Sequence, residues 1–386
     1  MRRTPVDLLI VGQGLAGSAL AWQAAARGLC VHVIERPPVQ GRRPSASSVG
    51  AGLITPITGA RLALGWRFDE FRSATASFYE RVAANTGTRC FTDRPALRWL
   101  SPAEEELWSQ KCFKTPSLKP YLRAINPTGI CRSSDPLQGP ENIRPYEMPL
   151  AARVNLPLFL EVTRAWLERE QAFSFEEFAP QSAIWSATDA VWQVGGITAR
   201  RIVLCTGYSP ALLRIPFLAA KGELLEVSLP GQPSTHTWHH GAWATPQEED
   251  LWLVGATYDP QHLDDQPTPE GRTELCTALE KLGVSRPQVI SHQAAVRPAV
   301  PGQMPVIGWL KREDLVPSLP GHPPEATSAW GVINGLGSRG SLWAPLLADW
   351  LLDASTGARI PSEVDIHRFL ASKPPVAKTP RGLAPQ

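Results

Sequence analysis

The chain has 386 residues, of which 43% are hydrophobic and 19% charged, a composition typical of a globular protein with a sizeable core. Lys and Arg number 38 against 36 Asp and Glu, so the net charge of +2 provides no global attraction to nucleic acid or to an anionic membrane. Six scattered cysteines without a Cys-x-x-Cys spacing predict reduced thiols in a cytoplasmic protein. The length predicts two domains, because a single hydrophobic core stops growing at about 250–300 residues.

The N-terminal stretch has the pattern of a strand, a tight turn, a helix and a second strand. An apolar run at residues 6–11 leads into Gly-x-Gly-x-x-Gly at residues 12–17, and an Ala-rich helix former occupies residues 18–27. Apolar residues alternate at residues 30–34 as in a strand, which ends at Glu35. A glycine turn between a strand and a helix, with an acid about 20 residues further on, is typical of dinucleotide-binding proteins.

The residue type at each key position of this motif has a physical explanation. Gly12 permits the turn, Gly14 lets the backbone approach a pyrophosphate at the helix N-terminus, and Gly17 lets the helix pack closely on the strand. Glu35 can accept hydrogen bonds from an adenosine ribose, which favours FAD or NAD over NADP, although Arg36 beside it weakens this exclusion. The motif leaves the choice between FAD and NAD open. The alternative is a glycine turn in a parallel sheet that binds no ligand.

Further elements in the first half of the chain follow from local patterns. Small residues at 45–54 would allow backbone to approach a flat or anionic ligand, or would form an ordinary flexible loop. Apolar spacing predicts a long amphipathic helix over residues 61–84, and residues 87–149 form a Pro-rich, mixed region. Asn155 is predicted to cap another helix, with Pro157 in its first turn.

The second half of the chain contains mostly strand patterns. Residues 221–228 alternate as in a half-solvated antiparallel strand. Residues 331–340 form a strand and a glycine-rich turn before a helix at residues 344–352, a second place where helix N-terminal amides could meet an anion. Further strands are predicted at residues 190–196, 199–207, 238–243 and 251–258, and a further helix at residues 269–282.

Histidines cluster at one place in the chain, at His236, His239 and His240. They could be zinc ligands, but no fourth ligand follows at a suggestive spacing, and clustered histidines often line a polar strand face. We therefore expect no metal site.

Together these segments resemble the D-amino-acid oxidase and glycine oxidase (DAO) family of flavoenzymes. The likeness runs from about residue 6 to residue 352, and the order and spacing of several motifs carry it. It implies FAD as the cofactor and an α/β fold, in which a Rossmann-like FAD-binding domain is interleaved with an antiparallel-sheet (α+β) substrate domain. The motifs are the glycine turn with Glu35, Ser47-Ser48 to Gly52-Leu53, residues 199–207, Lys221-Gly222-Glu223, Gly255-Ala256-Thr257, Arg297-Pro298, residues 305–308 and residues 337–345.

The resemblance also implies how the chain is divided. Both domains are expected to be built from separated pieces of the sequence. The expected boundaries are 1–86, 150–216 and 297–372 for the FAD-binding domain, and 87–149 and 217–296 for the substrate-binding domain. Residues 373–386, rich in Pro and Lys, are expected to form a disordered tail.

Several residues acquire expected roles from the resemblance. Arg297 matches an arginine of glycine oxidase that meets the substrate carboxylate, and a planar guanidinium suits bidentate capture of that group. A salt bridge near a domain boundary is the alternative for Arg297. The expected catalytic residues are Arg297, Trp243, Ser338 and Arg339. The expected cofactor-binding residues are Gly12, Gly14, Leu15, Ala16, Gly17, Glu35, Arg36, Ser47, Ser48, Gly52, Leu53, Gly207, Gly337, Ser338, Arg339, Gly340, Ser341 and Leu342.

Two positions depart from the glycine oxidase pattern. The substrate-side tyrosine falls on Trp243, and the flavin-side arginine falls on Ser338, next to Arg339. The Gly-Ser-Arg-Gly segment at residues 337–340 is similar instead to the oxidoreductase half of the bifunctional MnmC enzymes, which removes a carboxymethyl group from 5-carboxymethylaminomethyl-uridine in tRNA. We expect no counterpart of their methyltransferase half in this chain.

The expected reaction is oxidation of the C–N bond of an amino acid or an N-substituted, glycine-like amine, by hydride transfer to flavin N5 and hydrolysis of the imine. The alternatives are a tRNA wobble-uridine oxidoreductase and a non-catalytic FAD-binding partner subunit. A site rimmed by arginines such as Arg94, Arg98 and Arg123 would favour tRNA, and a closed apolar pocket would favour a free amino acid. No membrane partner is expected, and the sequence leaves open the substrate, the electron acceptor, the oligomeric state and any covalent flavin attachment.

Overall fold

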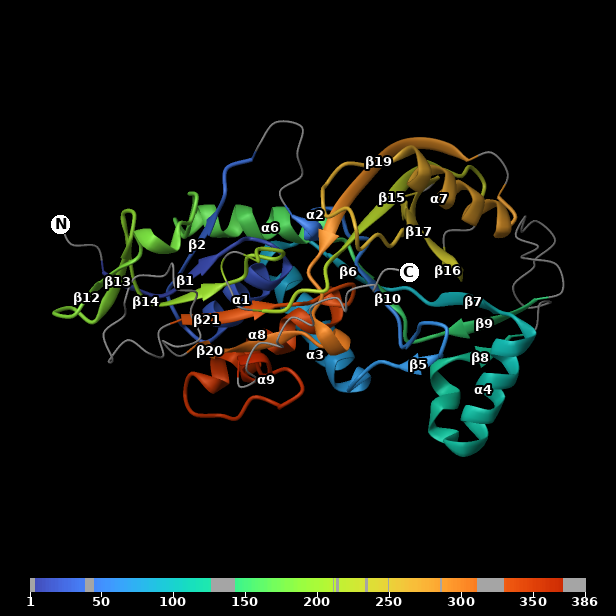
Figure 1. The fold of residues 1–386 in the computed structure, drawn as a ribbon, viewed down its shortest axis with the longest axis horizontal. Coiled ribbons are helices and arrows are strands. Elements are labelled where there is room, and N and C mark those ends of the chain that lie inside the picture. The colour runs from blue at the N-terminus through green and yellow to red at the C-terminus, as the bar shows by residue number, and fades with distance from the viewer. Residues whose placement is uncertain are drawn as a thin grey trace, which may run out of the picture.

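The computed structural model describes most of the chain, and two large β-sheets lie side by side along its long axis (Figure 1). The described residues are 4–38, 45–125, 143–210, 212, 215–232, 235–248, 250–284, 287–310 and 330–370. Among them, no helix is long and apolar enough to cross a membrane. The tail predicted at residues 373–386 lies outside the described residues.

The first sheet has a parallel centre and carries the N-terminal motif. Its strands are β1 (Val6–Val11), β2 (Val31–Glu35), β11 (Phe173–Phe175), β12 (Ile184–Ser186), β13 (Val191–Val194), β14 (Ile197–Leu204), β20 (Val306–Leu310) and β21 (Trp330–Asn334). The parallel strands follow the order β11, β2, β1, β14 and β21, whereas β12, β13 and β20 join antiparallel. Because both faces of a parallel sheet are covered, β1 and β21 are nearly continuous apolar runs.

Helices pack on this sheet, and one of them begins at the glycine turn. They are α1 (Leu15–Ala26), α3 (Phe68–Thr86), α6 (Leu156–Arg169) and α8 (Gly340–Ala354). Helix α1 is apolar on almost every side because α6 and α8 both pack against it. Trp22 of α1 stacks on Trp166 with ring centroids 4.0 Å apart, and its Nε1 donates to Thr163 Oγ1 (2.9 Å). The turn that precedes α1 is therefore fixed to a rigid core.

The predicted cap of α6 is confirmed by the structure. The Asn155 side chain accepts a hydrogen bond from the Leu158 backbone N–H (3.3 Å), and Pro157 lies in the first turn. The helix predicted over residues 61–84 begins only at Phe68. The preceding residues form strand β5 (Ala63–Leu64), which pairs with β4 (Ile57–Thr58). Pairing within this short hairpin has overridden the apolar spacing that suggested a helix there.

The second sheet is almost entirely antiparallel. Its strands are β7 (Ala96–Leu100), β8 (Arg123–Ala124), β9 (Arg144–Met148), β15 (Ala220–Ser228), β16 (Thr237–His240), β17 (Ala242–Glu248), β18 (Leu251–Gly255) and β19 (Gln288–Arg297). They follow the order β19, β15, β18, β17, β16, β7, β9 and β8, and only β16 and β7 pair in parallel. Helix α7 (Pro269–Lys281) packs against β15, β17 and β18 (Figure 1).

Strand β15 was predicted in the correct place but with the wrong environment. Two of its charged residues are buried rather than solvated, since Lys221 and Glu223 are each 2% exposed. Lys221 Nζ donates to Asp264 Oδ1 (3.1 Å), and the Glu223 carboxylate accepts from the backbone N–H and the hydroxyl of Thr268 (both 2.8 Å). The prediction of a single strand over residues 238–243 is also wrong, because Gly241 makes the turn between β16 and β17.

Smaller elements complete the fold. The region predicted as mixed contains a capped helix, whose signal is the Ser101 and Glu104 capping box. The remaining elements are α2 (Ala46–Val49), β3 (Leu53–Ile54), β6 (Phe91–Asp93), α4 (Pro102–Lys114), η1 (Pro116–Tyr121), β10 (Ala152–Val154), η2 (Pro180–Ser182), η3 (Pro301–Gln303) and α9 (His367–Leu370). The two large sheets take their strands from alternating parts of the chain, as a discontinuous domain requires, and the domain boundaries themselves stay a prediction.

Candidate active site

A cavity of ≈ 760 Å³ lies between the two sheets. Its walls include the carboxyl ends of β1, β2, β14 and β21 on one side, and β15, β17, β18 and β19 on the other. The carboxyl ends of parallel strands are where open α/β sheets bind ligands. The volume is in the ordinary range for a cavity that binds a small molecule or a cofactor.

The glycine turn is shaped by close contacts that exclude any side chain. Gly12 has φ +101°, and a Cβ built on it would lie 2.6 Å from the Cys205 carbonyl oxygen. A Cβ on Gly17 would lie 1.9 Å from the Gly12 carbonyl oxygen, so α1 packs directly on the turn. Gly14, at the N-cap of α1, lines the cavity. The backbone therefore offers the cavity a bare turn and a helix N-terminus, which suits a pyrophosphate.

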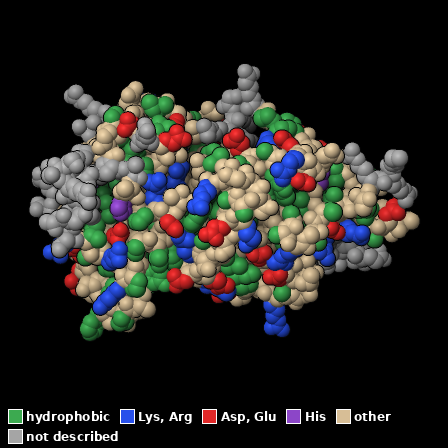
Figure 2. All heavy atoms as spheres, turned by 180° about the vertical axis from the view of Figure 1, so that it is seen from behind, with side chains coloured by type: hydrophobic (Ala, Val, Ile, Leu, Met, Phe, Trp, Pro, Cys, Tyr) green, Lys and Arg blue, Asp and Glu red, His purple; other side chains and the backbone are tan. Residues whose placement is uncertain are grey.

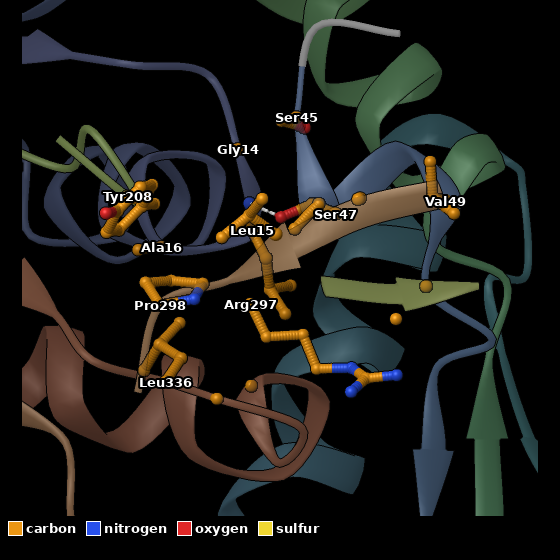
Figure 3. A pocket seen from close by; sticks show the side chains of 18 of the residues that line it. Gly14, Leu15, Ala16, Ser45, Ser47, Val49, Tyr208, Arg297, Pro298 and Leu336 are labelled. Atoms are coloured by element: carbon orange, nitrogen blue, oxygen red, sulfur yellow. Dashed lines mark hydrogen bonds between the residues drawn. The ribbon is translucent and has the colours of Figure 1, made fainter. Parts of the chain in front are cut away.

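Glu35 lies at the end of β2 and is oriented by backbone N–H groups. Its two oxygens accept from Gln13 N (2.6 Å) and Arg36 N (3.1 Å), which leaves lone pairs for ribose hydroxyls. On the other side of the turn, Ser47 Oγ accepts from Leu15 N (2.9 Å), as the dashed line in Figure 3 shows. The two contacts tie both ends of the glycine turn to cavity-lining side chains.

A buried arginine, which was not predicted from the sequence, holds the segment of small residues at 45–54. Arg153 donates from Nε to the Ala51 carbonyl (3.0 Å), from Nη1 to the Pro246 carbonyl (3.3 Å) and from Nη2 to Gln247 Oε1 (2.6 Å). Burial lowers the pKa of Arg153 to about 10. Within the segment, a Cβ on Gly52 would lie 1.8 Å from the Val154 carbonyl oxygen. Arg153 thus clamps this wall of the cavity to the second sheet.

The end of β14 meets the glycine-rich segment after β21. Asn334 Nδ2 donates to the Gly207 carbonyl (2.9 Å), and Asn334 Oδ1 accepts from Gly335 N (2.8 Å). Thr206 Oγ1 is buried in the cavity wall and has no hydrogen-bond partner among the described residues. A buried hydroxyl without a partner is costly unless a ligand satisfies it. This observation, together with the bare glycine turn, fits a polar dinucleotide in the cavity.

Arg297 and Trp243 lie on the second sheet and face the cavity across two glycines. The Arg297 guanidinium lies over Gly222, and the Trp243 ring lies over Gly255, so that a Cβ on either glycine would overlap the side chain above it. Arg297 Nη2 donates to the Thr257 carbonyl (3.2 Å), and Figure 3 shows the guanidinium directed away from the Gly14 turn. Burial lowers the pKa of Arg297, while Tyr258 opposes that shift.

Arg297 forms no ion pair with any side chain that the structure describes, so the salt-bridge alternative is not what its surroundings show. Its remaining N–H donors are available to a ligand. A partly buried guanidinium without a carboxylate partner is a candidate site for an anion.

The structure brings most of the predicted residues into the cavity wall and leaves four elsewhere. Gly17, in the first turn of α1, packs on the Gly12 carbonyl, and Leu342 is 3% exposed in the core. Ser48 Oγ donates to the Ser45 carbonyl (2.7 Å), and Arg339 lines a second, smaller cavity beside the main one. The predicted residues that line the main cavity are Gly12, Gly14, Leu15, Ala16, Glu35, Arg36, Ser47, Gly52, Leu53, Gly207, Trp243, Arg297, Gly337, Ser338, Gly340 and Ser341.

Other lining residues were not predicted because they lie in connections without a motif. They include Glu176, Phe178, Tyr208, Tyr258, Leu263 and Asp264. Cys205 also lines the cavity, and burial raises the pKa of its thiol, so this cysteine stays protonated. Five of the cysteines are described, and all five are free.

The arginines considered for an RNA-binding rim do not line the cavity. Arg98 pairs with Glu104 (3.1 Å), and Arg123 pairs with Glu147 (2.6 Å). Burial lowers the pKa of Arg94, the third of them. Figure 2 shows basic and acidic side chains interspersed on one face of the molecule.

The clustered histidines have separate surroundings. His236 faces Glu147 (3.5 Å), and burial lowers the pKa of His239 to about 3, a neutral imidazole at physiological pH. Within the described residues, no group of three or more His, Cys, Asp or Glu side chains could hold a metal ion.

A Rossmann-type sheet with this glycine turn, facing an antiparallel sheet across a cavity, is the arrangement of a dinucleotide-binding protein. The chain belongs to the FAD dependent oxidoreductase (DAO) family, whose model matches residues 7–354, and its cofactor is FAD. The glycine turn, Glu35 and the unpartnered Thr206 hydroxyl are the features here that fit this cofactor.

Relatives and similar structures include enzymes that are named for different activities. The tRNA 5-methylaminomethyl-2-thiouridine biosynthesis bifunctional protein MnmC of Caulobacter vibrioides is 28% identical over 369 residues, which is 90% of this chain and 54% of that protein. Glycine oxidase of Pseudomonas aeruginosa is 26% identical over 329 residues, 78% of this chain and 85% of that protein. Thus the chain spans about half the length of its MnmC relatives.

Solved structures show the same fold. Glycine oxidase from Geobacillus kaustophilus superposes with a TM-score of 0.73 at 18% identity, covering 95% of this chain and 98% of that one. Iminodiacetate oxidase from Chelativorans sp. BNC1 superposes with a TM-score of 0.70 at 20% identity, covering 94% of this chain and 98% of that one.

Proposed function

We propose that this FAD-dependent oxidoreductase oxidises the C–N bond of a small amine that carries a carboxylate, either an amino acid or an N-substituted, glycine-like amine. The observation that carries the proposal is the cavity-lining Arg297 guanidinium, which has one protein hydrogen bond and no carboxylate partner among the described residues. A bidentate contact from this guanidinium would fix the substrate carboxylate and thereby the position of the adjacent carbon. The glycine oxidase relative supports this substrate class.

The chemistry divides between the cofactor and the chain. FAD, when bound, supplies the two-electron acceptor for a hydride from the substrate carbon. Arg297 binds the carboxylate, and Trp243 forms an apolar wall beside it. The substrate carbon gives up a hydride and its nitrogen gives up a proton, so a C=N bond forms, and water then hydrolyses it to a carbonyl compound and an amine. No histidine lines the described cavity, which is consistent with an amine that binds unprotonated.

The remaining assignments belong to the same proposal. The first sheet and its helices would bind FAD through the glycine turn, Glu35 and the glycine-rich segment before α8, and the second sheet would present the substrate. We place the reaction in the cytoplasm because the described cysteines are free.

The direct test is the visible spectrum of the holoprotein, recorded anaerobically before and after addition of glycine, N-methylglycine, D-amino acids or iminodiacetate. We expect one of these to bleach the flavin, and Arg297→Met to abolish the bleaching while FAD stays bound. If Arg297→Met also lost FAD, its loss of bleaching would say nothing about substrate binding. Arg297→Lys is therefore measured in parallel, because it keeps the positive charge but not the planar guanidinium that can bind a carboxylate through two N–H groups. A flavin that none of these amines reduces contradicts the proposal.

A second candidate is oxidation of a modified wobble uridine in tRNA. The observation that favours it is the 28% identity to the MnmC protein across 90% of this chain. Arg98 and Arg123 form ion pairs and do not line the cavity, which does not support an RNA-binding rim at the site. Bleaching by tRNA that carries carboxymethylaminomethyl-uridine, but by no free amine, would establish this candidate instead.

A further inference from the structure

A second cavity of ≈ 290 Å³ meets the main one beside Arg297. The two cavities share five lining residues, Tyr258, Arg297, Leu336, Gly337 and Ser338. The rest of the smaller wall comes from the start of β15, from η3 and from the N-terminus of α8. A ligand held at Arg297 therefore lies where a substituent could extend from one cavity into the other.

Arg297 and Arg339 are the two charged side chains in the described wall of the smaller cavity. Arg339 Nη2 donates to Thr58 Oγ1 (3.0 Å), and the guanidinium lies 5.4 Å from the centroid of the Trp343 ring. Neither arginine has a carboxylate within ion-pair distance among the described residues. Both side chains are partly buried, which lowers the pKa of each, so each guanidinium has given up part of its hydration without gaining a counter-charge.

Two partly buried guanidinium groups that face one small space without a carboxylate partner would be stabilised by an anion between them. Buried charges in proteins are ordinarily paired, and an arginine has five N–H donors, of which the protein contacts described here use one on each side chain. The proposed function assigns one carboxylate to Arg297. Arg339 then remains as the partner for a second acidic group, and the side chain of Gln303 in the same wall can add a hydrogen bond.

We propose that the smaller cavity is a subsite for a second acidic group, and that the preferred substrate is a secondary amine with a carboxylate on each side of its nitrogen. This inference rests on the proposed function, because Arg297 must hold the first carboxylate. The proposal excludes an uncharged substituent as the best occupant of the smaller cavity, since an uncharged group would leave Arg339 without a counter-charge.

Binding of unreactive sulfur analogues to the holoprotein tests the proposal without catalysis. Thiodiacetate has two carboxylates and (methylthio)acetate has one, and neither contains a C–N bond. By isothermal titration calorimetry we expect thiodiacetate to bind about tenfold to a hundredfold more tightly, the range for hydrogen bonds to a charged group. Arg339→Met should bring this ratio close to one. Arg169→Met, which removes a 65% exposed arginine paired with Glu170, should leave the ratio unchanged.

A second variant keeps the test valid if Arg339→Met does not fold. Ala299→Leu adds bulk to the smaller cavity without removing a charge, and it should also lower the affinity ratio. Equal affinity of the wild type for the two analogues, or an unchanged ratio in both variants, overturns the proposal. A different result is expected if the proposed function is wrong and Arg297 does not bind a carboxylate. Arg297→Met would then bind both analogues as tightly as the wild type does.

Discussion

A Cβ atom on Gly222 would lie 1.8 Å from Nη2 of Arg297, so the guanidinium rests directly on the backbone of the neighbouring strand. Gly222 is on β15 and Arg297 ends β19, and the two strands pair along their length. The absence of a side chain at residue 222 is what allows Arg297 to lie across the sheet and reach the cavity.

We predict that Gly222→Ala lowers kcat/KM by about a hundredfold, because a displacement of about 1 Å in a positioning group has an effect of that size. FAD content should stay close to that of the wild type, since the substitution is on the substrate side of the cavity. The measurement is steady-state kinetics with the amine that bleaches the flavin. Gly196→Ala is the matched control, because a Cβ there meets nothing within 4 Å. Equal losses in both variants would contradict the predicted contact.

We predict that Glu35→Gln weakens FAD binding about tenfold, the loss of a hydrogen bond that involves a charged acceptor. The glutamine amide nitrogen cannot accept from Gln13 N or Arg36 N, so one of these backbone contacts is lost as well. Titration of the apoprotein with FAD, followed by flavin fluorescence, gives the dissociation constant. The control is Glu170→Gln at the end of α6, where the side chain is 53% exposed. An unchanged FAD affinity in Glu35→Gln would show that this carboxylate does not hold the cofactor.

We predict that Arg153→Met lowers the free energy of unfolding by about 2–4 kcal/mol, because it leaves two backbone carbonyls and the Gln247 side chain without their donor. Arg153→Lys should recover only part of this loss, since an ammonium cannot reach all of the acceptors that the planar fork reaches. Urea unfolding of the holoprotein measures both. The exposed Arg169→Met variant should change stability by less than about 0.5 kcal/mol. A stability equal to that of the wild type in Arg153→Met would mean that the clamp is dispensable.

We predict a loss of stability on acidification that depends on His239. Burial, and secondarily the charge of Arg98, lowers the pKa of this imidazole from 6.5 to about 3 in the folded protein. Between these two values the unfolded chain binds the proton and the folded protein does not, so stability falls as the pH falls. The slope from this group is at most about 1.4 kcal/mol per pH unit.

Urea unfolding at pH 7, 5 and 4 tests this dependence. His239→Gln should reduce the fall in the free energy of unfolding between pH 6.5 and pH 4. His262→Gln, which removes a 68% exposed imidazole, should show the same pH dependence as the wild type. If the two variants show the same slope, the buried imidazole is not the source of the pH dependence.

The order of β1, the glycine turn, α1 and β2 was predictable because each step is local. A Gly residue with positive φ, a helix N-terminus and an acid at the end of the next strand are all within one short stretch. The cap of α6 was equally local, since the side chain of Asn155 bonds to the first turn of its own helix. The family resemblance then supplied FAD, which the glycine turn alone could not distinguish from NAD.

Contacts between distant segments decided the rest. Arg153 reaches acceptors about 100 residues away on either side in sequence, and no spacing rule could place it there. Lys221 and Glu223 alternate like solvent-facing residues, yet partners from the connection before α7 bury them. The placement of Arg339 in the smaller cavity together with Arg297 also depends on the N-terminus of α8 lying near the start of β15 and η3. Local sequence thus determined the dinucleotide motif, whereas long-range packing determined which charges remain unpaired around the two cavities.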